Sequence, residues 1–163
     1  MRKFWHWLLV AVMVVVLDQA TKWAILQHFV EGERQELLPV FNLTLLFNRG
    51  AAWSFLHDAG GWQQYIFGGL ALVVSGVILR VLAKQPALQW QNWALSLVLG
   101  GAIGNLIDRL VQGKVTDFIQ VHWQNAYFPA FNVADAAITV GAILLILEAL
   151  FIKKPAAAGD TDR

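Results

Sequence analysis

The sequence predicts an all-α polytopic membrane protein with four transmembrane helices, a small extracytoplasmic β-sheet and a short interfacial helix. Of its 163 residues, 58% are hydrophobic and only 14% are charged, whereas an average soluble domain carries about 25% charged residues. The apolar residues are also gathered into four long runs, which the core of a soluble domain does not need. Composition and clustering therefore predict the fold class, and the distribution of cations predicts its orientation.

Four segments are long enough to cross a bilayer, since a helix needs about 20 residues for a hydrocarbon core of about 30 Å. They cover residues 4–26, 64–81, 90–110 and 134–152. The fourth has its longest uncharged stretch only from Ala136 to Leu147. The first could be taken for a cleavable signal peptide, but Asp18-Gln19-Ala20 is a poor cleavage site and three more apolar segments follow. We therefore expect the first segment to be retained as a span.

Lysine and arginine residues orient the four spans. One end of the spans collects six cations, namely Arg2, Lys3, Arg80, Lys84, Lys153 and Lys154. Because cationic flanks remain in the cytoplasm, we expect both termini inside and the segments 27–63 and 111–133 outside. Residues 1–154 then form a single membrane-embedded domain, and the polar tail 155–163 is expected to be disordered.

The two outer segments are more apolar than ordinary loops. Leu37 to Phe47 contains β-branched and aromatic residues, and Val115 to Trp123 alternates in polarity. Both patterns favour short strands, which we expect to lie on the membrane surface. Ala51 to His57 is typical of a short amphipathic helix in the interface.

Several classes of function are disfavoured by what the sequence lacks. It contains no cysteine, which excludes disulfides, thiolate nucleophiles and thiolate metal sites. No two of its four histidines are spaced i, i+4, and none belongs to an HExxH motif, so a zinc hydrolase is poorly supported. No basic tract suggests nucleic-acid binding. We expect no metal and no cofactor.

Charged residues at the outward ends of the spans require a partner or a function, because a charge at membrane depth is costly. Asp18 and Lys22 are four residues apart on the first helix and share one face. An i, i+4 ion pair that also contacts neighbouring helices explains them, and a direct catalytic role is the alternative.

The third span combines small and polar residues. Gly100 and Gly104 lie four apart, which permits close approach of another helix. One turn further outward, Asn105, Asp108 and Arg109 share a face. Asp108 is open equally to a structural and to a functional role. Asn105 and Arg109 donate hydrogen bonds and are candidates for contacting a substrate backbone.

Asp117 and Asp135 are the candidate catalytic residues. Asp117 lies in the outer strand segment and Asp135 at the mouth of the fourth span, both in apolar sequence. Two poorly solvated carboxylates close together cannot both ionise easily, so one should hold a proton. The ionised one can then draw a proton from water while its partner donates to a scissile carbonyl. The alternative is that each only caps a helix, Asp135 being favoured there by the helix dipole.

Five short stretches taken together resemble the lipoprotein signal peptidases, or signal peptidase II. They are Asp18-Gln19-Ala20-Thr21-Lys22, Asn48-Arg49-Gly50-Ala51-Ala52, Gly100 to Arg109, Val115-Thr116-Asp117-Phe118 and Phe131-Asn132-Val133-Ala134-Asp135. Alone, the second stretch reads only as a turn entering a short helix. All five occur in the order and spacing of that family. One departure is Trp53, where the family often has phenylalanine; it preserves an aromatic anchor.

The resemblance implies an aspartic endopeptidase of the bacterial inner membrane, with its active site at the periplasmic face. We expect a monomer. Such enzymes cut prolipoproteins before a cysteine that already carries diacylglycerol, so the expected partners are that substrate and membrane lipid. The resemblance makes Asp117 and Asp135 catalytic. Substrate binding would fall to Asn48, Gly50, Asn105, Arg109 and Asn132, and structural support to Asp18, Lys22 and Asp108.

Two other classes of function compete with the peptidase. A small transporter or proton channel could use Asp18, Asp117 and Asp135 as a relay. It would need acids distributed through the depth of the bilayer, whereas the middle of the spans is almost free of them. A non-catalytic membrane scaffold leaves the apolar setting of Asp117 and Asp135 unexplained.

Overall fold

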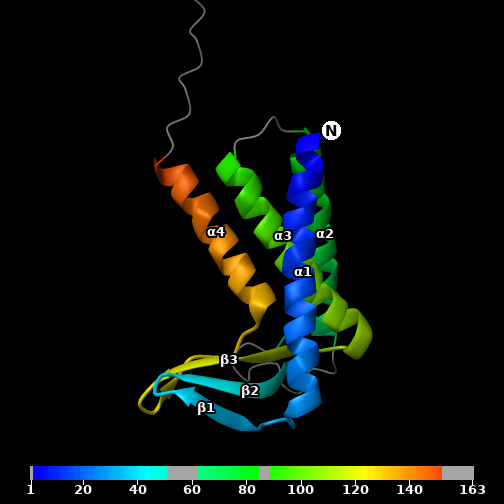
Figure 1. The fold of residues 1–163 in the computed structure, drawn as a ribbon. Coiled ribbons are helices and arrows are strands. Elements are labelled where there is room, and N and C mark those ends of the chain that lie inside the picture. Colours follow the sequence, from blue (N-terminus) through cyan, green and yellow to red (C-terminus); the bar gives the residue numbers. More distant parts are fainter. Residues whose placement is uncertain (1, 51–61, 85–88, 152–163) are drawn as a thin grey trace, which may run out of the picture.

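Four long helices stand on a small antiparallel sheet in the computed structural model, which describes residues 2–50, 62–84 and 89–151 (Figure 1). In chain order the elements are α1 (Arg2–His28), β1 (Arg34–Leu38), β2 (Phe41–Asn48), α2 (Gln63–Lys84), α3 (Gln89–Gln112), β3 (Val115–Trp123), β4 (Ala126–Tyr127) and α4 (Val133–Phe151). All four helices are long and apolar enough to cross a membrane, as predicted. The predicted interfacial helix at 51–57 and the tail 155–163 lie outside the described residues.

Helix α3 is the centre of the bundle, and it packs against each of the other three helices. In its most apolar stretch 56% of the residues are buried, against 22%, 22% and 17% in α1, α2 and α4. Two glycines allow α1 to approach it closely. A Cβ at Gly100 would lie 2.6 Å from the Val14 Cβ, and one at Gly104 would lie 2.6 Å from the Asp18 Oδ2. The close approach expected from their spacing is confirmed.

The sheet has the order β1-β2-β3-β4 and lies at the end of the bundle opposite the first residues of α1 (Figure 1). The predicted strand segment 37–47 is in fact the end of β1, a turn at Pro39 and Val40, and most of β2. Proline has no N–H for the strand ladder, so β1 ends before Pro39. Strand β1 begins at Arg34, among charged residues that lie outside the apolar segment predicted from Leu37.

Strand β3 has the predicted bounds, but its first four residues are all buried rather than alternating. Helices α1 and α3 contact this strand, and they cover both sets of side chains where β3 leaves α3. This part of the sheet is therefore enclosed, which matters for Asp117.

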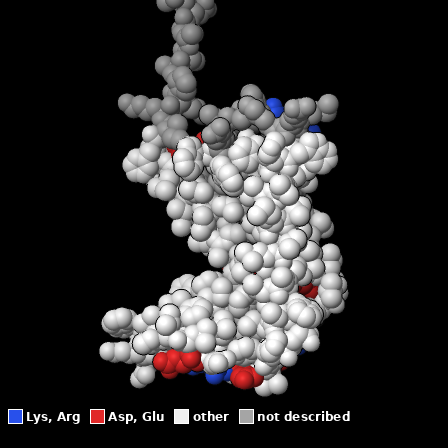
Figure 2. Space-filling model, viewed as in Figure 1, with Lys and Arg blue, Asp and Glu red and all other residues white. Residues whose placement is uncertain are grey.

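Charged side chains gather mainly at the two ends of the molecule, and the flank between them is almost uncharged (Figure 2). The first residues of α1 and the last of α4 lie at the same end, away from the sheet (Figure 1). A hollow separates the helices from the protruding part of the sheet in the space-filling view. This arrangement is that of a multi-pass membrane protein with a small sheet at one end of its helices.

Candidate active site

Asp117 and Asp135 are brought together by the way the chain returns from the sheet to α4. Asp117 lies in β3 and Asp135 in the first turn of α4. Between them, Phe131 forms an antiparallel bridge with Ile119. The Ile119 N–H donates to the Phe131 carbonyl at 2.8 Å, and the Phe131 N–H donates back to the Ile119 carbonyl at 3.0 Å. The bridge holds Asn132 and the start of α4 beside β3.

Asn132 connects the two carboxylates. Its side-chain Nδ2 donates to the Asp117 Oδ1 at 2.7 Å. Its Oδ1 accepts the Asp135 N–H at 2.9 Å, and its own N–H donates to the Asp135 Oδ2 at 3.4 Å. This reciprocal pattern is a capping box. Asp135 thus does cap α4, as the alternative held, and the cap fixes its carboxylate next to the atom that binds Asp117.

Asn105 holds Asp135 from the other side. Its Nδ2 donates to the Asp135 Oδ1 at 2.7 Å, and its Oδ1 accepts from the Asn132 Nδ2 at 3.2 Å. Both amides therefore make hydrogen bonds inside the protein and are buried. This geometry suits positioning of the carboxylates rather than the substrate contacts expected from the sequence.

Asn48 approaches Asp117 from the end of β2. The Gly50 N–H donates to the Asn48 Oδ1 at 2.8 Å, so the amide nitrogen of Asn48 is the atom that faces the Asp117 carboxylate, to which it is hydrogen bonded. Gly50 has a φ of 89°, which favours glycine, and a Cβ there would lie 2.7 Å from the Phe67 ring. The turn at Gly50 thus orients Asn48.

Arg109 lies at the edge of the site, near the end of α3. Its Nη1 donates to the Asn105 carbonyl at 3.2 Å, and its guanidinium lies 5.5 Å from the centre of the Phe67 ring. A guanidinium has five N–H donors. Arg109 is therefore the described residue of this set that is best suited to hold a carbonyl oxygen of a bound peptide.

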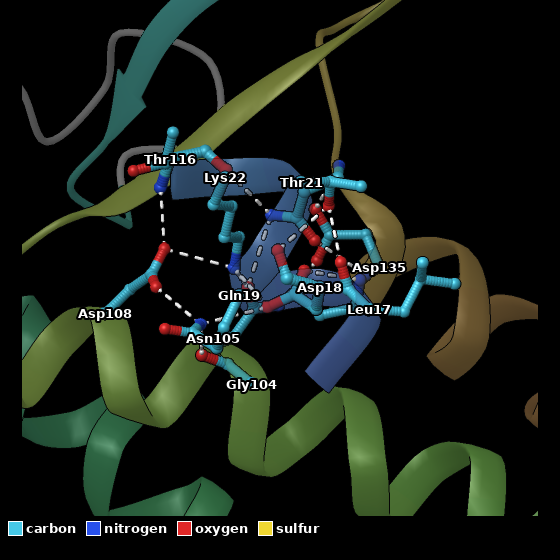
Figure 3. A network of polar contacts seen from close by, with 12 residues as sticks. Leu17, Asp18, Gln19, Thr21, Lys22, Gly104, Asn105, Asp108, Thr116 and Asp135 are labelled. Atoms are coloured by element: carbon cyan, nitrogen blue, oxygen red, sulfur yellow. Dashed lines mark hydrogen bonds and ion pairs between the residues drawn. The ribbon is translucent and has the colours of Figure 1, made fainter. Parts of the chain in front are cut away.

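A buried ion cluster of Asp18, Lys22 and Asp108 lies next to the site (Figure 3). The Lys22 Nζ lies 2.8 Å from the Asp18 Oδ2 and 3.0 Å from the Asp108 Oδ2. It also donates to the Asn105 Oδ1 at 3.1 Å. These three contacts use all three N–H groups of the ammonium. The predicted ion pair of Asp18 and Lys22 is confirmed, and the contacts of Asp108 are those of a structural group.

Each carboxylate of the cluster holds the backbone next to one candidate catalytic residue. The Asp18 Oδ1 accepts the N–H of Ala134, which precedes Asp135, at 2.9 Å. The Asp108 Oδ2 accepts the N–H of Thr116, which precedes Asp117, at 2.9 Å. One lysine between two carboxylates therefore sets the positions of α4 and β3 relative to each other.

Gln19 belongs to this cluster and was not among the predicted site residues. Its Nε2 donates to the Asp108 Oδ1 at 2.9 Å, and to the Asp18 Oδ2 and the Gly104 carbonyl at 3.1 Å each. Its polar side chain next to Asp18, at the end of a long apolar run, was the available signal.

The surroundings of Asp117 change its acidity. The pKa of Asp117 is raised to about 7, first by burial and then by the charge of Asp135, while hydrogen bonds from Asn48 and Asn132 and the charge of Lys22 oppose the rise. Near neutral pH Asp117 is therefore partly protonated. In the described part of the chain, no group of three or more histidine, aspartate or glutamate side chains could hold a metal ion.

This raised pKa predicts how stability depends on pH. The native protein binds the Asp117 proton more tightly than the unfolded chain, whose aspartates titrate near 3.9. The resulting stability is fully present below pH 4 and is lost as the pH rises to about 7. We expect the melting temperature of the wild type, relative to Asp117→Asn, to fall between pH 4 and pH 8. Thermal unfolding in detergent measures it, and a constant difference would contradict the raised pKa.

Fold and site together define a multi-pass membrane protein with a buried aspartate, Asp117, linked through Asn132 to a second aspartate, Asp135, at one end of its helices. A family model described as "Signal peptidase (SPase) II" matches residues 10–151. The chain belongs to the signal peptidase II family of membrane peptidases. This membership favours hydrolysis over the transporter and scaffold alternatives.

Relatives and solved structures agree with this assignment. The lipoprotein signal peptidase of Tolumonas auensis is 56% identical over 154 residues, covering 93% of this chain and 92% of that protein. The one from Acinetobacter baylyi is 48% identical over 149 residues, covering 91% and 83%. A bacterial membrane enzyme solved by the in meso method at 2.3 Å superposes with a TM-score of 0.81, at 32% identity, covering 96% of this chain and 94% of that one.

Proposed function

We propose that this peptidase removes signal peptides from diacylglyceryl-modified prolipoproteins by cutting on the N-terminal side of the lipidated cysteine. The relatives named lipoprotein signal peptidase support the substrate class. The observation that carries the mechanism is the buried Asp117, with a pKa of about 7, tied through Asn132 to Asp135.

In the proposed reaction the two carboxylates divide the acid and base roles. Asp117 carries the shared proton, and Asp135 acts as the general base. Asp135 takes a proton from water as the water oxygen bonds to the scissile carbonyl carbon, and Asp117 gives its proton to the carbonyl oxygen. The tetrahedral intermediate collapses by returning that proton to Asp117, while Asp135 protonates the leaving amine. Both carboxylates end in their starting states, and the peptide bond is replaced by an acid and an amine.

The other site residues keep this geometry in place. We assign Asn105 and Asn132 to orientation of the carboxylates, because their amides bind them directly. Arg109 positions a substrate carbonyl, and Asn48 and Gly50 form the wall of the site next to Asp117. Asp18, Lys22 and Asp108 keep α4 and β3 in register.

The site lies at the end of the helices that is next to the sheet, and this position suits a substrate that is anchored in the membrane by its lipid. We propose that the protein lies in the bacterial inner membrane with both termini in the cytoplasm and the sheet on the periplasmic side. Arg80 and Lys84, at the end of α2 opposite the sheet, support this orientation. The hollow between helices and sheet (Figure 2) offers room for an extended peptide that approaches from the bilayer.

Paired substrates test this proposal. The purified protein is incubated with a prolipoprotein carrying diacylglyceryl-cysteine and with the same prolipoprotein lacking the lipid. We expect cleavage of the modified form alone, with lipidated cysteine as the new N-terminus by mass spectrometry. Cleavage at another bond, or equal cleavage of both forms, would overturn the proposed specificity.

A further inference from the structure

Two adjoining cavities lie on the α2–α3 side of the molecule, and Arg109, at the edge of the site described above, lines the second of them. The first has a volume of about 340 Å³ and is lined by Arg49, Gln64, Gln112, Gly113 and Lys114. The second, of about 450 Å³, runs between α2 and α3. Both are lined by Gln64 and Gly113, so they lie next to each other. Neither is lined by Asp117 or Asp135.

The first cavity has the chemistry of an oxyanion site. Arg49 and Lys114 supply two cations, and Gln64 and Gln112 supply amide groups. The Lys114 ammonium lies 3.2 Å from the centre of the Phe47 ring, a cation–π contact that holds it in place. Among the described residues that line the two cavities, none is acidic. A phosphate group fits this set, since lysine and arginine bind it through charge-assisted hydrogen bonds.

The second cavity is mostly apolar. Gly68, Gly69 and Leu72 line it from α2, and Leu106 and Leu110 from α3. A Cβ at Gly69 would have nothing within 4 Å, so the glycine leaves open space along the helix. Leu72 and Leu110 are exposed on the apolar flank of the protein. An acyl chain could therefore enter this trough directly from the bilayer.

The cationic cavity adjoins the apolar one where the helices meet the sheet. A charged region next to an apolar region matches the polarity of one phospholipid molecule. We propose that the α2–α3 groove binds an anionic phospholipid, with its phosphate at Arg49 and Lys114 and one acyl chain along Gly69. The diacylglyceryl group of a prolipoprotein carries no phosphate and has no use for the two cations. The cationic cavity at Arg49 and Lys114 therefore favours a phospholipid over the diacylglyceryl group of the substrate.

Native mass spectrometry of the full chain, titrated in detergent with single lipids, tests the headgroup. We expect one phosphatidylglycerol to bind at least about tenfold more tightly than diacylglycerol, because each hydrogen bond to a charged group contributes about 1.5 kcal/mol or more. The double variant Arg49→Gln, Lys114→Gln should lose about tenfold in phosphatidylglycerol affinity. Arg34→Gln removes a cation from β1 and should change nothing. Equal binding of diacylglycerol, or an unaffected double variant, would overturn the proposal.

A second variant tests the acyl chain. Gly69→Leu fills the trough without a clash, and leucine is a better helix former than glycine, so the protein should fold. We expect it to weaken phosphatidylglycerol binding several-fold. Gly76→Leu is the matched control, because a Cβ there also meets open space and Gly76 lines neither cavity. Unchanged binding by Gly69→Leu, or displacement of the lipid by millimolar inorganic phosphate, would reduce the groove to a simple anion site and refute a lipid one.

Discussion

Replacing either Asp117 or Asp135 by asparagine should lower the rate of prolipoprotein cleavage by at least about 100-fold, the lower end of what a general acid or base contributes. Asparagine keeps the size of the side chain and can still accept the hydrogen bonds from Asn132 and Asn105. It cannot exchange a proton with water or with the scissile carbonyl. The loss should therefore appear in kcat, with substrate binding largely retained, in an assay with diacylglyceryl-modified prolipoprotein.

Both variants should remain folded and membrane-inserted, as judged by thermal unfolding and size-exclusion elution. Glu36→Gln is the matched control, since it neutralises an exposed acid in β1 on the same end of the molecule. It should cleave at the wild-type rate. Full activity of Asp117→Asn or Asp135→Asn would remove that residue from the catalytic pair while leaving the family assignment intact.

Lys22→Met should produce the largest loss of stability of any single substitution in the described part of the site. It removes the cation between Asp18 and Asp108, whose side chains are 0% and 5% exposed. Breaking a buried ion pair by deleting one partner costs about 3–5 kcal/mol, because the remaining charge is left uncompensated. Here two carboxylates lose their partner at once. Thermal unfolding in detergent measures the effect.

The comparison with Lys84→Met separates this loss from a general effect of removing a lysine, since Lys84 is exposed at the far end of α2. Asp18→Asn should also lower the melting temperature, by less, because asparagine can still accept the Ala134 N–H. An unchanged melting temperature for Lys22→Met would contradict the structural role given to the cluster.

Sequence reasoning succeeded wherever one segment decides its own structure. The four spans follow from long apolar runs, which in water could not be left exposed, and their bounds differ from the helices by only a few residues. Strand β3 was predicted from its own alternation. The i, i+4 spacing of Asp18 and Lys22 placed both on one face, and their ion pair follows.

Contacts between distant segments could be decided only by the tertiary structure. The bridge of Phe131 to Ile119 brings α4 beside β3, and nothing local to either residue specifies it. For the same reason the sequence could not show that the amides of Asn105 and Asn132, predicted to contact a substrate, bind Asp135 and Asp117. Gln19 was overlooked because two of its three partners, Gly104 and Asp108, lie on α3.

The sequence by itself determined the set of membrane-spanning helices. It also identified the polar residues at membrane depth, which need a partner or a function because their burial is costly. Apolar periodicity and burial cost are properties of a segment and can be read from its residues alone. The structure alone decided which oxygen faces which N–H, because a hydrogen bond depends on positions within a few tenths of an ångström. Only the packing of α1, α3, α4 and β3 fixes those positions, and with them the burial that raises the pKa of Asp117.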